Sequence, residues 1–236
     1  MLTIEKTVLP SNAQWEIIIE GMRNPMNSWD KMDSHCEMFH LGEADHKLME
    51  SLAKGGPVHA KYRRMIPVYL TINAPLYWWK EFDTYKVGTV CNSCSTMHKI
   101  HSKEFTMDDF SHEHLFDGID IKEGESDMEY YENPTTCLDY VIAVLNHYRG
   151  KFIGTMNKPM KDNTKRSEVA KKYWWQMIQL LPTSYNQKRT IMLNYEVLVN
   201  IYHSRKNHKL DEWHTFCEWI ESLPYAELIT GGEEDG

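Results

Sequence analysis

Residues 66–99 read IPVYLTINAPLYWWKEFDTYKVGTVCNSCSTMHK, and this stretch carries most of the information about the fold. Its first part, 66–73, is rich in β-branched and aromatic residues, which predicts a strand. Pro75 suits the first turn of a helix, so residues 75–84 are predicted to be helical. The aromatic run at 77–79 indicates core packing beside the strand or, alternatively, a platform for a planar ring.

Helical patterns occur on both sides of this stretch. Residues 11–22 begin with a capping box formed by Ser11 and Gln14, and residues 45–56 end at two glycines. Apolar stripes and helix-stopping residues predict four later helices, at 135–153, 165–181, 186–204 and 210–223. Early strands followed by helices predict an α+β fold with a helical carboxy-terminal half.

Two segments lack regular patterns. Residues 104–133 are strongly acidic and weakly periodic, which predicts an acidic insertion or surface loop. The last residues, ITGGEEDG at 229–236, predict a disordered tail.

The composition narrows the class of protein. The chain has 236 residues, of which 42% are hydrophobic and 25% charged, as in ordinary folded proteins. Its net charge of −8 argues against binding to duplex nucleic acid, although a local pocket can still take a small anion. No apolar run reaches the length of a membrane span, and the first residues lack a signal-peptide pattern. We therefore expect a cytoplasmic protein without a membrane partner.

The cysteines suggest reduced thiols rather than a disulfide framework, because their number is odd and no secretory signal precedes them. They are Cys36, Cys91, Cys94, Cys137 and Cys217. The Cys91-x-x-Cys94 pair lies close to His98 and His101 in the sequence, and this pattern suggests either a zinc half-site or a redox pair. This spacing is too compressed for an ordinary zinc module, so a packed turn is favoured and no metal is predicted.

A second informative segment, NYEVLVNIYHSRKNHK, covers residues 194–209. In a helix, Asn194 and Arg205 would lie about three turns apart on one side, with Asn200 roughly a third of a turn or more away. Apolar residues between them predict a mostly buried helix, and polar groups beside such a face need partners. Those partners are either the backbone or a bound cofactor.

Taken together, the two segments resemble the flavin-dependent thymidylate synthases, the ThyX family. In that family a strand leads into a helix that ends in Arg-His-Arg, and a run like S-x-N-x-x-S-x-R-Y follows after a short turn. Here residues 66–86 occupy the strand and the helix without a gap, and TVCNSCSTMH, 89–98, occupies the turn with about one extra residue.

The late segment carries the other half of the resemblance. Asn194, Asn200 and Arg205 reproduce the family's late Asn, Asn and Arg spacing, and the preceding Leu-Pro is present at 181–182. His59 falls where the family has a flavin-contacting histidine. The resemblance covers roughly residues 40–103 and 165–222.

Several family residues are replaced. The Arg-His-Arg tripeptide reads Thr84-Tyr85-Lys86, and the Gln before it is Glu81. The Arg and Tyr of the serine run read Met97 and His98, and the Arg between the late asparagines reads Glu196. Arginine grips phosphate through a bidentate fork that these side chains lack, so binding of a dianionic phosphate should be weakened.

The resemblance implies a single domain over residues 1–236, with a small antiparallel sheet flanked by helices. It also implies a homotetramer in which FAD, NADPH and methylenetetrahydrofolate convert dUMP to dTMP. The implied catalytic residues are Ser95 and Arg205. The implied cofactor-binding residues are His59, Tyr85, Lys86, Thr89, Asn92, Asn194 and Asn200. The implied substrate-binding residues are Lys80, Glu81, Ser95, Thr96 and Arg205. The alternatives are a flavoenzyme with an altered substrate and a non-catalytic binding or structural protein on the same scaffold.

Overall fold

The computed structural model describes residues 1–35, 40–117, 133–159 and 162–231. Contacts within the chain divide it into two compact units. Unit 1 consists of Met1, residues 74–79 and residues 93–187, and unit 2 of residues 2–73, 80–92 and 188–236. The boundaries fall inside regular elements, and the single domain over 1–236 stays a prediction.

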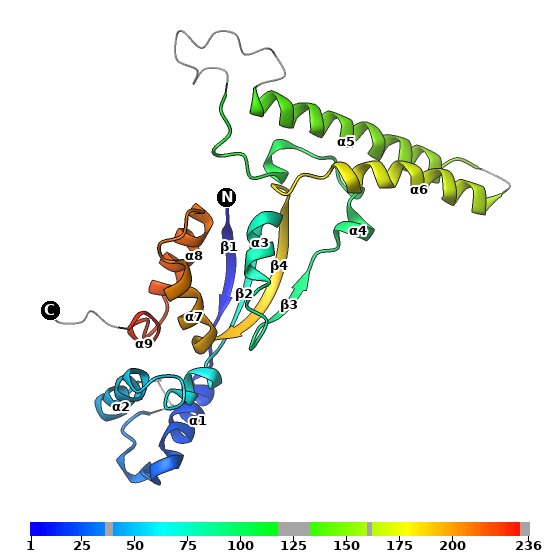
Figure 1. Ribbon diagram of the computed structural model, residues 1–236. Coiled ribbons are helices and arrows are strands. Elements are labelled where there is room, and N and C mark those ends of the chain that lie inside the picture. Colours follow the sequence, from blue (N-terminus) through cyan, green and yellow to red (C-terminus); the bar gives the residue numbers. More distant parts are fainter. Residues whose placement is uncertain (36–39, 118–132, 160–161, 232–236) are drawn as a thin grey trace, which may run out of the picture. The chain divides into compact units, whose positions relative to one another are not determined.

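A four-stranded sheet has the order β1-β2-β4-β3 (Figure 1). Its strands are β1 (Thr3–Val8), β2 (Pro67–Pro75), β3 (Val90–Ser93) and β4 (Asn186–Asn194). β1 runs antiparallel to β2, with Thr3 opposite Asn73. In β2, Val68, Leu70 and Ile72 are buried while Tyr69 is exposed. This alternation is the period of a strand with one buried face, and it confirms the strand predicted at 66–73.

Helices make up most of the remainder of unit 2. They are α1 (Asn12–Arg23), α2 (Glu43–Lys54), α7 (Tyr195–Arg205), α8 (Asp211–Glu221) and α9 (Glu227–Thr230), with short 3₁₀ turns at Asn24–Met26, Trp29–Lys31 and η3 (Lys61–Met65). α7 contacts η3, α8 and α9. Buried side chains such as Trp15, Leu198, Trp213 and Phe216 form the core between these elements.

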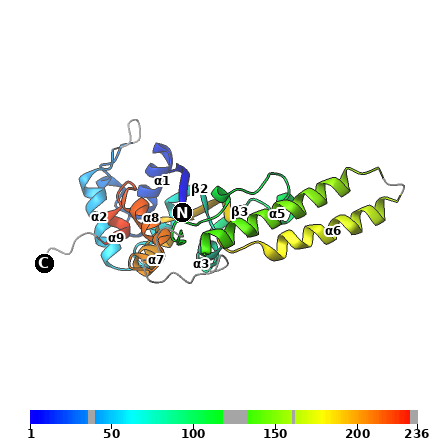
Figure 2. The ribbon, with the colours of Figure 1, turned by 90° about the horizontal axis from the view of Figure 1, so that it is seen from above.

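Unit 1 contains a helical hairpin in which α5 (Pro134–Met156) packs along α6 (Asn163–Leu180) (Figure 1, Figure 2). The short elements α4 (Thr96–Lys99) and η4 (Met107–Asp109) belong to the same unit, and α3 (Leu76–Phe82) crosses the boundary between the units. Phe105 and Phe110 pack with Leu145 and Met177 in the core of this unit. The first part of the acidic segment is therefore packed and not simply a surface loop. Residues 118–132 of that segment lie outside the described residues.

Most predicted elements are confirmed, including the capping box, in which the Ser11 backbone N–H donates to Gln14 Oε1 at 2.8 Å. The helix predicted at 186–204 is wrong in its first half, because residues 186–194 form β4 and only α7 is helical. The predicted helical carboxy-terminal half therefore contains a strand. In β4, Gln187, Ile191 and Leu193 are buried while Lys188 and Thr190 are exposed, which is the period of a strand.

The predicted tail also needs a correction. Ile229 and Thr230 belong to α9, and Ile229 is fully buried beside Leu228. Residues 232–236 lie outside the described residues. Among the described residues, no helix has the length and apolar character that a membrane span requires.

Candidate functional site

Arg205, at the end of α7, meets two residues from the predicted site at the end of α3. Its Nε donates a hydrogen bond to the Tyr85 hydroxyl at 2.8 Å, and its Nη1 donates to Glu81 Oε2 at 2.7 Å. The structure thus brings together Glu81 and Arg205, which were both predicted to bind the substrate, and Tyr85, which was predicted to bind the cofactor.

Two further side chains complete this Arg205 cluster. Trp213 Nε1 donates to Glu81 Oε2 at 3.0 Å, and His208 Nε2 lies 3.3 Å from the same oxygen. The guanidinium of Arg205 lies over the Trp213 ring, 4.7 Å from its centroid. A phosphate approaching Arg205 must therefore compete with a carboxylate that already compensates its charge.

A small cavity of about 110 Å³ adjoins this cluster. Tyr85, Lys86 and Thr89 line it, together with Phe82, Asp83 and Cys91. The Thr89 hydroxyl oxygen is buried and has no hydrogen-bond partner among the described residues. Ligand pockets usually measure about 300–1,000 Å³, so this cavity is smaller than a usual ligand pocket.

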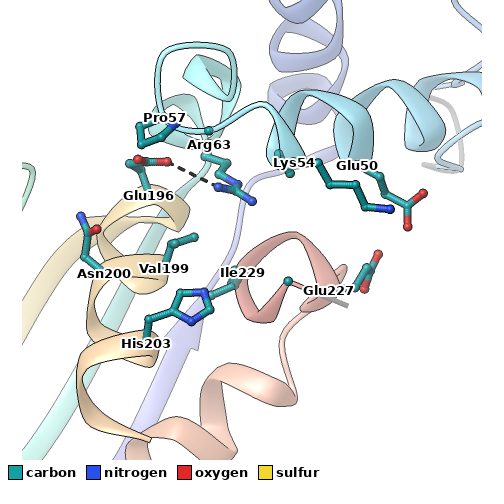
Figure 3. A pocket seen from close by; sticks show the side chains of 13 residues that line it. Glu50, Lys54, Pro57, Arg63, Glu196, Val199, Asn200, His203, Glu227 and Ile229 are labelled. Atoms are coloured by element: carbon teal, nitrogen blue, oxygen red, sulfur yellow. Dashed lines mark ion pairs between the residues drawn. The ribbon is translucent and has the colours of Figure 1, made fainter. Parts of the chain in front are cut away.

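A larger cavity of about 630 Å³ lies between α2, the loop after it, η3, α7 and α9 of unit 2 (Figure 3). Its charged lining residues are Glu50, Lys54, Arg63, Glu196 and Glu227. Asn200 and His203, one turn apart on α7, line the same cavity. Of the predicted cofactor residues, Asn200 lines it, whereas His59 is an exposed residue of the loop that also carries Gly56 and Pro57 of the lining.

Arg63 and Glu196 form a buried pair in the wall of this cavity (Figure 3). Their side chains are 7% and 11% exposed, and Arg63 Nη1 lies 3.9 Å from Glu196 Oε2. Arg63 Nε and Glu196 Oε2 are both buried without a hydrogen-bond partner among the described residues. The sequence drew attention to Glu196 only as a replaced arginine, and it gave no signal for Arg63.

Other predicted site residues take structural or exposed positions. Asn194 caps α7, because its Oδ1 accepts a hydrogen bond from the Val197 backbone N–H at 3.1 Å. Asn194 therefore precedes the helix. The prediction that it shares a helical face with Arg205 is wrong. Lys80, Lys86 and Asn92 are exposed.

The predicted substrate residues Ser95 and Thr96 belong to unit 1. Ser95 is the N-cap of α4, where its Oγ accepts a hydrogen bond from the His98 backbone N–H at 3.1 Å. Thr96 is the first residue of that helix and is half-buried.

The thiols are free wherever the structure describes them. Cys91, Cys94 and Cys137 are exposed and Cys217 is buried, whereas Cys36 lies outside the described residues. Within the described part of the chain, no group of three or more His, Cys, Asp or Glu residues is arranged to hold a metal ion.

The fold is similar to that of several solved structures. Thymidylate synthase X (ThyX) from Helicobacter pylori, crystallised with FAD and dUMP, matches with a TM-score of 0.57 and 12% identity, over 97% of this chain and 95% of that one. A second structure of the same complex matches with a TM-score of 0.55 and 12% identity, over 97% and 96% of the two chains. The UMP/dUMP methylase PolB from Streptomyces cacaoi, bound with 5-Br dUMP, matches with a TM-score of 0.55 and 11% identity, over 98% and 92%.

No family model and no curated protein matches the sequence. The likeness at 11–12% identity establishes the fold, which extends over nearly the whole chain. The α+β, ThyX-like fold that the sequence predicted is thereby confirmed.

Proposed function

We propose that the protein binds FAD and acts on the base of a pyrimidine nucleotide, as a reductive methylase of the thymidylate synthase type. The observation that carries this proposal is the 630 Å³ cavity of unit 2, within a chain whose fold matches proteins crystallised with FAD and dUMP. The volume lies within the range of about 300–1,000 Å³ that is usual for ligand pockets.

The residues around the cavity fit part of a flavin. A flavin ring carries both hydrogen-bond donors and acceptors, and the wall offers an amide at Asn200 and two buried polar atoms without partners, Arg63 Nε and Glu196 Oε2. We propose that Asn200, Arg63 and Glu196 hold the ring and that the exposed His59 contacts it from the rim. When bound, FAD would supply the redox chemistry, while the protein binds, orients and excludes water.

The fuller scheme includes NADPH as reductant, methylenetetrahydrofolate as carbon donor and a homotetramer. In this scheme the hydroxyls of Ser95 and Thr96 bind the nucleotide, and Tyr85, Lys86, Thr89, Asn92 and Asn194 lie along the cofactor. Asn194 already caps α7 and Arg205 already pairs with Glu81, so each of them would have to exchange a contact within the protein for a contact with the ligand.

The experiment is a flavin titration of the purified protein. Absorbance and flavin fluorescence are recorded with added FAD, followed by dUMP binding and by NADPH oxidation with methylenetetrahydrofolate present. Asn200→Ala should weaken FAD binding, whereas Asn207→Ala, at an exposed position outside the cavity lining, should leave it unchanged. A protein that neither carries nor takes up FAD would refute both flavoenzyme readings and favour the binding or structural role.

A second candidate is a flavoenzyme whose substrate carries less negative charge than dUMP. The observation that favours it is the ion pair between Arg205 and Glu81, which leaves a phosphate in competition with a carboxylate. This candidate predicts that deoxyuridine binds about as tightly as dUMP, because the phosphate of dUMP then adds little to the binding free energy. A dissociation constant for dUMP at least tenfold lower would exclude it.

A further inference from the structure

We propose that Arg63 and Glu196 together recognise the imide edge of a planar heterocycle, which is the adjacent carbonyl and N–H of a uracil or flavin ring. The inference rests on the proposed function for the choice of a flavin as one probe. It assigns this pair a role that the sequence did not suggest, since Arg63 was not predicted as a site residue and Glu196 appeared only as a replaced arginine.

The first argument is burial without full pairing. The whole residues Arg63 and Glu196 are 6% and 9% exposed, and both line the large cavity. Their closest charged atoms lie 3.9 Å apart, which is beyond hydrogen-bond distance. Buried polar atoms in native proteins nearly always have a partner, yet Arg63 Nε and Glu196 Oε2 have none among the described residues. Two side chains that line the cavity therefore contain a donor and an acceptor that no described residue satisfies.

The second argument is chemical complementarity. A guanidinium only donates hydrogen bonds, and an ionised carboxylate only accepts them. The imide edge offers the matching pair, because its carbonyl oxygen accepts and its N–H donates. Arg63 would donate to the carbonyl oxygen and Glu196 would accept from the N–H. Both contacts are charge-assisted, which is the stronger kind of hydrogen bond.

The third argument is the charge of the lining. The carboxylates of Glu50, Glu196 and Glu227 face the two permanent cations of Lys54 and Arg63, with His203 beside them. Phosphate sites in proteins are built from cations or clustered backbone donors, and this lining has no excess of positive charge. The cavity therefore suits a neutral ring edge, and any phosphate of the same ligand lies outside it.

The test compares ligands that differ only at the imide N–H. The full-length protein is titrated with lumiflavin and N3-methyllumiflavin, and separately with uridine and N3-methyluridine. Methylation removes the hydrogen that Glu196 would accept and adds bulk against the carboxylate. We expect the parent compound to bind at least about tenfold more tightly in at least one pair, as the loss of a charge-assisted hydrogen bond predicts.

Variants then locate the effect. Glu196→Gln should weaken the parent ligand severalfold and leave the methylated one unchanged. The matched control is Glu218→Gln, an exposed position of α8 outside the cavity, which should change neither. Circular dichroism confirms that each variant is folded. Equal weakening of both ligands by Glu196→Gln would mean a purely structural ion pair and would overturn the inference.

The outcomes separate the inference from the proposed function. Discrimination within the uridine pair, without any lumiflavin binding, would refute the flavin function and support the imide site. Lumiflavin binding without discrimination in either pair would support the function and overturn the site. Absence of binding by all four compounds would overturn both.

Discussion

Arg205 illustrates how the neighbours of one side chain set its chemistry. Arg205 is the last residue of α7 and lies beside the Trp213 ring, and a guanidinium without an acidic neighbour can grip an anion through its planar fork. Here Glu81 accepts its hydrogen bond at 2.7 Å, and Tyr85 takes a second one. Because Glu81 stands where the resemblance has an uncharged glutamine, the same scaffold now holds an internal ion pair.

Removing the charge of Glu81 should free the guanidinium for a phosphate. For Glu81→Gln we expect the dissociation constant of dUMP to fall by about tenfold relative to that of deoxyuridine. The reason is that Arg205 is then free to make a charge-assisted contact with the phosphate. The control is Glu20→Gln, at an exposed position of α1. An unchanged ratio, measured by calorimetric titration, would mean that Arg205 does not meet the phosphate.

The thiols should differ in reactivity according to their burial. Burial raises the pKa of the Cys217 thiol to about 11, so at pH 8 it remains protonated, and the thiolate is the reactive form. We expect iodoacetamide to modify the exposed Cys91, Cys94 and Cys137 in the native protein, and Cys217 only in urea. Peptide mass spectrometry reads the sites. Equal rates for Cys217 and Cys137 in buffer would contradict the described burial.

Single residues were the hardest part to predict from sequence. The chain places Glu81 and Arg205 124 positions apart, and no local pattern shows that they pair with each other. Sequence reasoning therefore assigned both residues to substrate binding, whereas in the structure they form an ion pair with each other.

At the level of elements, the error at residues 186–194 has a clear cause. The stretch NQKRTIMLN holds charged and apolar residues at spacings that also suit a helix, and it runs directly into the helical α7. Its alternating burial appears only once β2 and β3 lie on either side of β4 in the sheet. Strand formation here depends on tertiary pairing, which local propensity does not report.

Asn194 is the last residue of β4 and the N-cap of α7, and its side-chain amide makes a hydrogen bond within the first turn of that helix. Replacing it with alanine should lower the free energy of unfolding by about 1 kcal/mol, because the cap to the Val197 backbone N–H is lost. Asn194→Asp and Asn194→Ser should remain close to wild type, since both keep an oxygen acceptor. Urea unfolding followed by tryptophan fluorescence measures the difference. A loss of FAD binding in all three variants, at unchanged stability, would instead assign Asn194 to the cofactor.

For the whole molecule, most helices were predicted from hydrophobic period, caps and stops, whereas β2 was the one strand of the sheet that the sequence predicted. The resemblance added the fold, which the structural comparisons confirm. The large cavity was not predictable, because α2, η3, α7 and α9 each contribute only a few of its residues. A cavity whose lining comes from residues 50–63 and from residues 196–231 leaves no contiguous signature in the sequence.

Alkaline stability tests the packing of unit 2. Burial raises the pKa of Tyr62 to about 12, and its hydroxyl donates to the Met49 carbonyl at 2.8 Å. The pKa in the folded state is above the unfolded value of about 10, so this contribution is full below pH 10 and is lost as the pH rises toward 12. We expect the free energy of unfolding to fall across that window.

Tyr62→Phe separates this effect from general alkaline damage. At pH 7 the variant should be less stable by about 1 kcal/mol, since a buried hydrogen bond is lost. Between pH 10 and 12 its stability should fall less steeply than that of the wild type, because one titrating group is gone. Tyr69→Phe, at an exposed position of β2, should keep the wild-type slope. Identical slopes for all three proteins would contradict the burial of Tyr62.

The pairing of Arg63 with Glu196 also constrains how this chain can diverge. Introducing arginine at position 196 alone would set a second cation beside Arg63 in a buried wall where opposite charges now lie 3.9 Å apart. Like charges at such a distance repel strongly when water is excluded. Changes at the two positions are therefore epistatic: an arginine at position 196 is expected to lower the free energy of unfolding unless the charge of residue 63 is altered as well.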